Sequence, residues 1–459
     1  MSQPAQASIT RLEEIVGAAN VLTHAADLDA CQADGMRPSA VLRPADATQI
    51  SEVIRFASTE KLAVIPCGGC TKLGIGSPPS RYDIALDLTR LNRVLAYDPR
   101  DLTLGIEPGA RIDDLLQCLA EQKQFLPLAV PFSDRATIGG IVAANSSSPL
   151  RHSYGGVRDF CLGMEFVTGE GIPAKSGGRV VKNVTGYDLH KLLIGSLGTL
   201  GVITRLNFRT FPLPSAQGTF IASFSDAGAA FGFCREIAQS VLTPQMVEVA
   251  EPGAAHFIFA AETPERITAE QWSVMVTAAG QPAVVDRHAR ELGHMAAGAN
   301  ADEFVRLSDA EQTSILERIR EFPRVVLEAA PSAMIFRISV VPTAMAPLLA
   351  RLGELAAQDQ LDIAALSCAS GVAYVAFLPR EGEIAPFAKL AKLASEVFQA
   401  CGDSGINANA MLEWCPAEVK RARGGVWGPL RPDFALMKRV KNSFDPKGIL
   451  CPGRFAGEN

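Results

Sequence analysis

The chain has 459 residues, 48% of them hydrophobic, and its 43 basic and 49 acidic residues give a formal net charge of −6. This length exceeds one ordinary hydrophobic core, so we expect two domains. The acidic balance favours neither a nucleic-acid partner nor an anionic membrane surface. We expect a cytoplasmic protein, because no run of 18 apolar residues could span a bilayer and the N-terminus lacks the features of a signal peptide.

After an N-terminal segment, residues 1–37, the sequence predicts an amphipathic helix and a strand. Apolar residues recur at helical spacing from 50 to 57, and Asp46 or Thr48 can cap this helix. The apolar run 62–65 then predicts a short strand that leads into a glycine-rich loop.

The loop at 66–76 reads Pro-Cys-Gly-Gly-Cys-Thr-Lys-Leu-Gly-Ile-Gly. Glycine lets the backbone approach a ligand closely, and successive N–H groups in such a turn can hold an anion. The loop is neither a dinucleotide fingerprint nor a P-loop, because no G-x-G-x-x-G opens a helix and leucine follows Lys72. A phosphate-bearing cofactor and a wide surface turn both remain possible from this loop alone.

Two further glycine-bearing turns occur at 131–140 and 195–203, and short strands separate them from the first. The turn at 131–140 opens a run of small apolar residues that ends at Asn145. Three such turns in one region are suited to a single elongated ligand held from several sides.

In their order, these motifs resemble the FAD-binding domain of the vanillyl-alcohol oxidase / p-cresol methylhydroxylase superfamily, in particular the FAD-binding accessory subunit of bacterial glycolate oxidase. The motifs are RPAD, PCGGCTKLG, DLTRLNRVL, EPGA, FLPL, ATIGG, PLRHSYG and GGRVVKNVTGYDLHKLLIGSLGTLGVIT. The resemblance runs from about 38 to 215 and resumes with FDPKGILCPGR at 444–454. It implies an α+β protein in which a two-subdomain PCMH-type FAD-binding domain carries a ferredoxin-like α+β cap domain.

The resemblance also implies one bound FAD and the residues that hold it. Thr71 stands where many relatives have the histidine that links the flavin, so we expect the FAD to be non-covalent. The implied cofactor-binding residues are Pro66, Cys67, Gly68, Gly69, Cys70, Thr71, Lys72, Leu73, Thr137, Ile138, Gly139, Gly140, Asn145, Tyr154, Gly155, Gly198, Thr199, Gly201, Val202 and Ile203.

Among the ten cysteines, Cys67 and Cys70 form a C-x-x-C pair at positions where the family usually has arginine and glycine. The spacing suits a redox motif or part of a zinc site. No second C-x-x-C accompanies this pair, so we expect no metal site. The chain also lacks a C-x-x-C-x-x-C run, so we expect no iron–sulfur cluster in it.

The middle of the chain, 216–430, predicts the cap, and 431–459 is expected to return to the first domain. Two strand-helix-strand-strand-like series suit a ferredoxin-like domain. We interpret the charged, helical segment 261–330 as an insertion. Strands are expected at 218–224, 246–250, 256–260, 333–341, 363–367 and 372–378, and helices at 227–240, 344–358 and 384–400.

Oxidation of a 2-hydroxy acid needs a base for the hydroxyl and a cation for the carboxylate. His152, in the motif RHSYG, is the candidate base, although a structural role is an alternative. Arg337 is the main candidate for the carboxylate, beside Arg151 and Arg158. No histidine follows residue 294, so the metal-binding histidines that the resemblance implies for relatives acting on D-2-hydroxy acids are missing.

The motif VKNVTGYD, with Lys182, Asn183, Tyr187 and Asp188, is expected to fix a turn between strands. Three functions remain open. The first is an FAD-binding subunit that works with a second FAD-linked subunit and an iron–sulfur subunit on a small 2-hydroxy acid, with membrane association only through those partners. The second is a free-standing flavin dehydrogenase, and the third is a structural subunit that binds no flavin.

Overall fold

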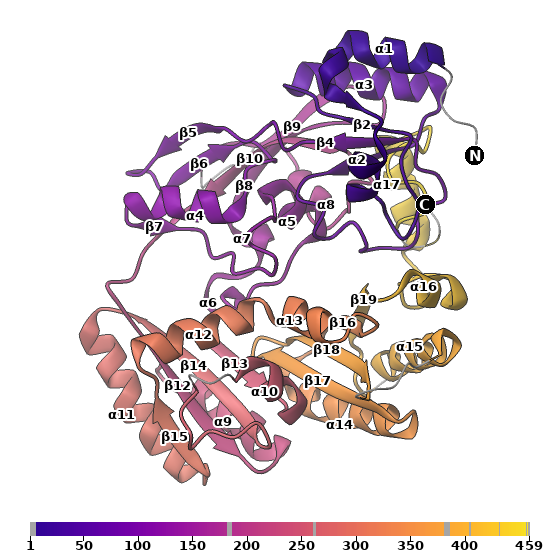
Figure 1. Cartoon of the computed structure of the whole chain (residues 1–459). Coiled ribbons are helices and arrows are strands. Elements are labelled where there is room, and N and C mark those ends of the chain that lie inside the picture. Colours follow the sequence, from indigo (N-terminus) through magenta and orange to yellow (C-terminus); the bar gives the residue numbers. More distant parts are fainter. Residues whose placement is uncertain are drawn as a thin grey trace.

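The computed structural model of the chain describes residues 6–180, 186–259, 263–380, 386–403, 405–430, 432–455 and 457. Figure 1 shows two stacked domains: the N-terminal part and the C-terminal helix form one, and the middle of the chain forms the other. We call them the first domain and the cap domain. In the described part of the chain, no helix combines the length and the apolarity needed to cross a membrane.

The first domain begins with a small sheet of order β1-β2-β4-β3. Strands β2 to β4 run parallel, and α1 (Gln6–Val16) and α3 (Ala47–Glu60) pack against the sheet. The carboxylate of Asp46 caps α3 by accepting hydrogen bonds from the N–H groups of Thr48 and Gln49, so Asp46 and not Thr48 is the cap. The strands are β1 (Val21–Leu22), β2 (Ala40–Leu42), β3 (Val64–Cys67) and β4 (Ile84–Asp87).

A second sheet of the first domain is antiparallel, with the order β5-β6-β10-β8-β9. Helices α4 (Ile112–Glu121) and α5 (Ile138–Ala144) contribute to its core. The two sheets confirm the expected two-subdomain arrangement. The strands are β5 (Val94–Asp98), β6 (Thr103–Ile106), β8 (Cys161–Val167), β9 (Pro173–Gly177) and β10 (Val202–Arg209).

The C-terminal region returns to the first domain through α17 (Phe434–Phe444) and the segment after it. Leu450 forms a parallel bridge with Val64 of β3. The ammonium of Lys441 is buried and donates to the carbonyls of Thr199 at 2.8 Å and Leu450 at 2.9 Å. These contacts fix the return segment beside the strand that precedes the glycine loop.

The cap domain has one eight-stranded antiparallel sheet, of order β15-β12-β14-β13-β17-β18-β16-β19. Each half is a β-α-β-β-α-β unit with the strand order of a ferredoxin-like fold, and β13 and β17 join the halves. The strands are β12 (Ala216–Phe224), β13 (Met246–Ala250), β14 (Trp272–Gly280), β15 (Glu303–Arg306), β16 (Met334–Ser339), β17 (Leu361–Cys368), β18 (Val372–Pro379) and β19 (Asn409–Trp414).

Two sequence expectations for the cap are wrong. The expected strand at 256–260 overlaps a helix, α10 (Pro252–Ile258), which Glu251 caps at Gly253. The expected insertion at 261–330 contains β14, which pairs with both β12 and β13 inside the sheet. Because β14 is buried on both faces, it lacks the apolar–polar alternation that identifies a half-exposed strand. Residues 260–262 lie outside the described part of the chain.

Four helices cover the outer face of the cap sheet, and the inner face is directed at the first domain. Helices α10, α12 (Asp309–Arg320) and α13 (Phe322–Ala329) lie on the inner side, between sheet and first domain in Figure 1. Ile75 and Leu197 of the first domain share one apolar core with Ile335 of β16. The outer helices are α9 (Ala227–Gln239), α11 (Pro282–Gly298), α14 (Pro342–Gln358) and α15 (Phe387–Gly402).

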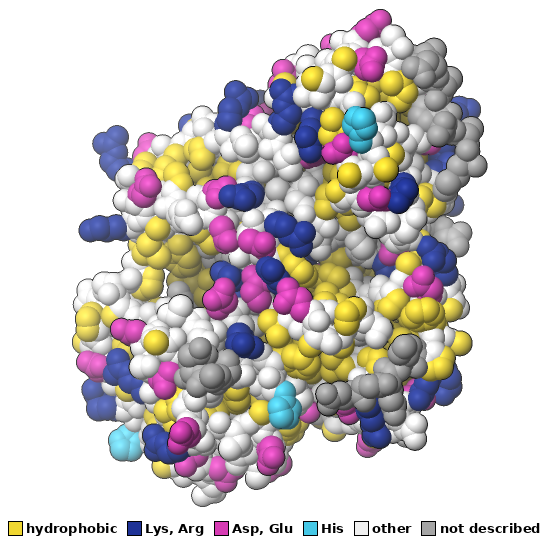
Figure 2. Space-filling model, viewed as in Figure 1, with side chains coloured by type: hydrophobic (Ala, Val, Ile, Leu, Met, Phe, Trp, Pro, Cys, Tyr) yellow, Lys and Arg dark blue, Asp and Glu magenta, His cyan; other side chains and the backbone are white. Residues whose placement is uncertain are grey.

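Charged side chains gather along the boundary between the two domains on the face shown in Figure 2. One ion pair that crosses this boundary joins Arg324 of α13 to Asp134 of the first domain, with 3.0 Å between Nη1 and Oδ1. Both side chains are partly exposed, so the pair contributes modestly to stability.

A buried ion triad joins the domains more firmly. The Oε1 atom of Glu413 lies 2.7 Å from Nζ of Lys72, and its Oε2 atom lies 3.2 Å from Nε of Arg337. The register between β16 and β19 shifts between Ile335 and Phe336, which pair with Trp414 and Leu412, so Glu413 is the extra residue of a β-bulge.

The triad links three parts of the chain around one carboxylate. Arg337 also donates from Nη1 to the carbonyl of Asn145 in the first domain. The side chain of Glu413 is fully buried, and burial alone would raise its pKa. The charges of Lys72 and Arg337 outweigh this effect, so the pKa of Glu413 lies below its ordinary value. Glu413 therefore stays ionised at neutral pH.

We predict that Glu413→Gln destabilises the protein by about 3–5 kcal/mol, because two buried cations lose their counter-charge. The pKa of Glu413 is lowered in the folded state, so its contribution is present above the pKa of an unfolded glutamate, about 4.3, and is lost as the pH falls below it. Denaturant unfolding of wild type and variant at pH 7 and at pH 4 measures this difference.

The matched control is Glu418→Gln, which removes an exposed carboxylate of α16 (Ala417–Arg423) and is expected to change stability by less than about 1 kcal/mol. A Glu413→Gln variant as stable as this control at pH 7 would contradict a stabilising triad.

Candidate functional site

The three glycine-bearing turns converge on one cavity of about 950 Å³, part of which is open to solvent. The cavity begins where β3 ends and extends along α5 towards residues 197–203. Most of the predicted cofactor-binding residues line it: Pro66, Cys67, Gly68, Gly69, Cys70, Thr71, Lys72, Leu73, Thr137, Gly139, Gly140, Gly198, Gly201 and Ile203.

The other predicted residues lie outside the lining of this cavity. Ile138 and Val202 lie in hydrophobic cores, and Asn145 ends α5 in the left-handed conformation. The ring of Tyr154 packs edge-on against Phe125 and Phe211, away from the cavity lining. The remaining two, Gly155 and Thr199, also lie outside the lining.

Buried cations hold the carbonyl side of the glycine loop. The guanidinium of Arg454 donates from Nη2 to the carbonyls of Leu73 and Ile75. The ammonium of Lys420 donates to the carbonyls of Gly74 and Gly76 and forms an ion pair with Asp34. Both cations are almost fully buried, so the loop is fixed from its inner side.

The amide side of the same loop is left free for a ligand. Within the described residues, no acceptor takes a hydrogen bond from the N–H groups of Gly68, Gly69, Cys70 or Thr71. Arg454 lines the cavity, and its buried Nη1 atom has no partner in the protein. Free N–H groups and an unpaired guanidinium nitrogen that face the same cavity fit a cofactor that carries phosphates.

Close backbone packing explains the glycines at the turn. A Cβ atom on Gly69 would lie 1.8 Å from the carbonyl oxygen of Arg135, and one on Gly68 would lie 2.1 Å from Oγ1 of Thr137. The first and second turns therefore contact each other without room for a side chain. This contact closes one wall of the cavity.

The sequence predicts a glycine-bearing turn at 131–140, whereas the structure has a helix at Gly139. Gly139 lies inside α5 and is not among the residues with positive φ. A Cβ atom there would lie 2.6 Å from Cβ of Pro108, so this glycine permits close packing within the protein. Gly140 also lines the cavity but is exposed, and a Cβ atom there has only Oγ1 of Thr137 nearby, at 3.3 Å.

Lys72 and Arg337 have roles that the sequence did not indicate. Lys72 lines the cavity, but its ammonium binds Glu413 and lies 4.8 Å from the ring centroid of Trp414, in the cap. Arg337, the candidate for the substrate carboxylate, already binds Glu413. Both cations therefore already have a partner within the protein.

A second, smaller cavity of about 360 Å³ lies beside the first, and Pro131 lines both. Residues 147–149 of the first domain line it on one side. The cap contributes Glu248 of β13, Arg320 of α12 and Tyr374 of β18. The cavity thus lies between the domains, next to the candidate cofactor site.

Glu248 is the most unusual group of the second cavity. It is fully buried, and its Oε1 atom has no hydrogen-bond partner among the described residues. Burial raises its pKa to about 8, against weaker opposing effects of Cys368 and Arg151. A buried carboxyl group with one unpartnered oxygen and such a pKa is typical of functional sites. The sequence does not single out Glu248, because a polar residue in the middle of the predicted strand 246–250 has the position of a solvent-facing residue in an alternating strand.

His152 lies on the short helix α6 (Arg151–Tyr154) and lines neither cavity. Burial lowers its pKa, so the ring is neutral at pH 7. Its role as a base stays a prediction that these cavities do not support. Lys182 and Asn183 lie outside the described residues, whereas Tyr187 is exposed and Asp188 pairs with Lys191.

Comparisons with known proteins agree with this geometry. Residues 38–175 match the family described as FAD binding domain, and residues 213–402 and 430–455 match the C-terminal domain of FAD linked oxidases. Two solved structures, 4-ethylphenol oxidase from Gulosibacter chungangensis and p-cresol methylhydroxylase, each superpose with a TM-score of 0.76 at 17% identity. They cover 99% and 98% of this chain, and 98% and 96% of their own chains are matched, which shows a common fold.

Curated relatives extend the likeness. The chain is 24% identical over 438 residues to glycolate oxidase subunit GlcD of Bacillus subtilis, covering 91% of this chain and 89% of that protein. It is 35% identical over 179 residues to glycolate oxidase subunit GlcE of Escherichia coli, covering 39% of this chain and 51% of that protein. With an FAD-binding domain and an FAD-linked oxidase C-terminal domain on one chain, this protein belongs to the FAD-linked oxidases and is an FAD-dependent oxidoreductase.

Proposed function

We propose that the chain is the FAD-binding subunit of a glycolate oxidase-type complex that oxidises a small 2-hydroxy acid, glycolate or D-lactate, to the 2-oxo acid. Relatives named as glycolate oxidase subunits, D-lactate dehydrogenase and D-2-hydroxyglutarate dehydrogenase support this class of substrate. The partners would be a second FAD-linked subunit and an iron–sulfur subunit. The complex would work in the cytoplasm, and any membrane association would come from the partners.

One observation supports a subunit over an independent enzyme. The described parts of strands β16 to β19, which form the half of the cap nearest the glycine loop, carry no histidine. Arg337 and Glu413, two charged residues of these strands at the domain boundary, form the ion triad with Lys72. These side chains therefore bind the first domain and not a substrate. A metal ion that would bind the hydroxy acid has no imidazole ligands on these strands.

A second candidate, a free-standing dehydrogenase, is favoured by Glu248. FAD, when bound, accepts the hydride from the substrate carbon. In this candidate Glu248 takes the hydroxyl proton, and Arg320 of the same cavity, which also pairs with Glu321, holds the carboxylate. With a pKa of about 8, Glu248 would be mostly protonated at pH 7, so the rate would rise as the pH increases through 8.

We predict one FAD per chain, released into solution when the protein is denatured. The physical reason is that Thr71 offers no nucleophilic ring nitrogen for the flavin. Flavin absorbance of the supernatant after acid precipitation measures the released fraction. Flavin that stays with the precipitate would contradict non-covalent binding, and a colourless protein that FAD cannot reconstitute would contradict flavin binding altogether.

We predict different defects for neighbouring glycines. Gly140→Leu, which projects into the cavity, is expected to weaken FAD binding at least tenfold while the flavin-free protein keeps its unfolding temperature. Gly139→Ala overpacks against Pro108 and is expected to cost about 1–3 kcal/mol of stability even without FAD. Flavin titration and thermal unfolding of the flavin-free variants separate the two effects. Unchanged FAD affinity in Gly140→Leu would contradict the position proposed for the cofactor.

The two candidate functions are separated by mixing the isolated, FAD-loaded chain with glycolate or D-lactate without oxygen. We predict that the flavin absorbance stays unchanged, whereas dithionite bleaches it fully. Rapid bleaching by either acid would overturn the subunit proposal and favour the free-standing dehydrogenase. In that case Glu248→Gln should slow bleaching by about 10²–10⁴-fold, and His152→Ala tests the competing base.

A further inference from the structure

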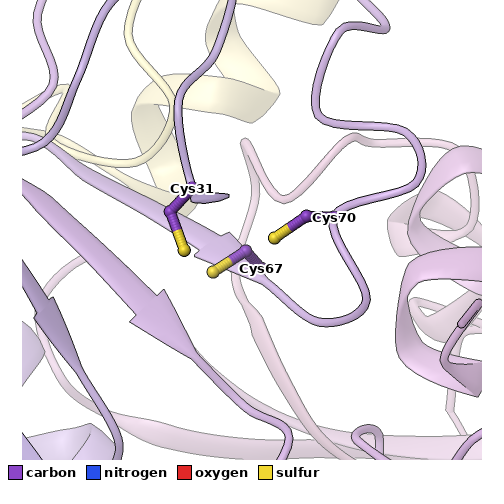
Figure 3. Close-up of side chains that lie close together, drawn as sticks. All are labelled: Cys31, Cys67 and Cys70. Carbon is purple, nitrogen blue, oxygen red and sulfur yellow. The ribbon is translucent and has the colours of Figure 1, made fainter. Parts of the chain in front are cut away.

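Three thiol groups from two distant parts of the sequence meet beside the glycine loop. Cys31 ends α2 (Ala25–Ala30), Cys67 ends β3, and Cys70 lies in the loop. The three Sγ atoms all lie within 4.8 Å of one another, and Figure 3 shows the three side chains grouped beside the start of the loop. In the described part of the chain, this is the one group of His, Cys, Asp or Glu side chains close enough to hold a metal.

The backbone around the thiols is held in place. The hydroxyl of Tyr82 donates to the carbonyl of Cys31 at 2.8 Å, and the carbonyl of Cys67 accepts from the N–H of Leu88 at 2.9 Å. Cys70 has a φ of 55°, a left-handed conformation that non-glycine residues adopt rarely. Cys70 therefore occupies a position where glycine would be unstrained, and its sulfur is the third member of the thiol cluster.

A metal ion binds the thiolate form of cysteine, so a cation bound here would displace the thiol protons. Cys31 and Cys67 are almost fully buried, so water competes weakly for the sulfurs.

We propose that Cys31, Cys67 and Cys70 bind a Zn²⁺ ion that ties the N-terminal segment to the glycine loop. Zinc takes thiolates at about 2.3 Å in a tetrahedral arrangement, which places two sulfurs about 3.8 Å apart, within the separation present here. The C-x-x-C spacing is the usual one for a pair of zinc ligands. The sequence alone predicted no metal because the third ligand lies 36 residues before Cys67, outside any second C-x-x-C motif.

The proposed site has an open fourth position. Cys67 and Cys70 also line the flavin cavity, so water or a cofactor group can complete the coordination from that side. Because the metal would fix Cys70 in the loop whose N–H groups face the cofactor, zinc binding should also strengthen FAD binding.

The test uses the full chain, purified under reducing conditions, stripped of metal, loaded with zinc sulfate and desalted. We expect about one zinc per chain by elemental analysis, and X-ray absorption at the zinc edge with three sulfur ligands. Cys31→Ser should lower the zinc content at least tenfold. The control is Cys118→Ser, which removes an exposed thiol of α4 and should leave zinc binding unchanged.

A second variant guards against a folding defect. Cys70→Gly suits the left-handed conformation and should unfold at or above the wild-type temperature, yet it should lose zinc. Equal zinc in the wild type and in Cys31→Ser, or zinc without sulfur ligands, would overturn the proposal. So would a wild-type chain that binds no zinc, whether its three thiols are free or two of them form a disulfide, which mass spectrometry after thiol labelling detects.

Discussion

The conformation of the glycine loop depends on cations buried beneath it. Lys420 and Arg454 donate hydrogen bonds to the four carbonyl groups from Leu73 to Gly76, and Lys420 forms an ion pair with Asp34. Buried cations are unfavourable unless they are paired and hydrogen-bonded, so the loop and the cations stabilise each other. With its carbonyls directed inwards, the loop has free amide groups at its start, and these line the cavity. The candidate cofactor site therefore lies on the outer side of the loop that these buried cations hold.

A second charge arrangement determines how the cap meets this site. Glu413 is placed by a β-bulge at the edge strand of the cap sheet, and it binds Lys72 of the loop. The same carboxylate binds Arg337, whose guanidinium also contacts the carbonyl of Asn145. The loop, the end of α5 and the cap are thus connected through one side chain. These contacts hold the two domains against each other, and Glu248 faces the second cavity between them.

The sequence allowed prediction of features that depend on neighbouring residues. Asp46 as a helix cap is a local pattern, and the structure confirms it. Each glycine turn is also a local pattern, and the structure places residues of all three turns around one cavity. The central position of β14 could not be predicted, because its pairing with β12 and β13 is non-local and both of its faces are buried. The role of Arg337 was also hidden, since its partner Glu413 lies 76 residues later and enters through a bulge.

The pairing of Val64 with Leu450 affects the order in which the protein folds during translation. Strand β3 and the loop after it are synthesised early, yet the bridge to Leu450 and the contacts of Arg454 require a segment made almost 400 residues later. Ordering contacts so distant along the chain is slow, because a large loop must close first. During translation the cap can fold as a unit before the first domain has its C-terminal segment. The conformation of the glycine loop therefore depends on the end of the chain, and a nascent chain that stops before Arg454 lacks the contacts that hold this loop.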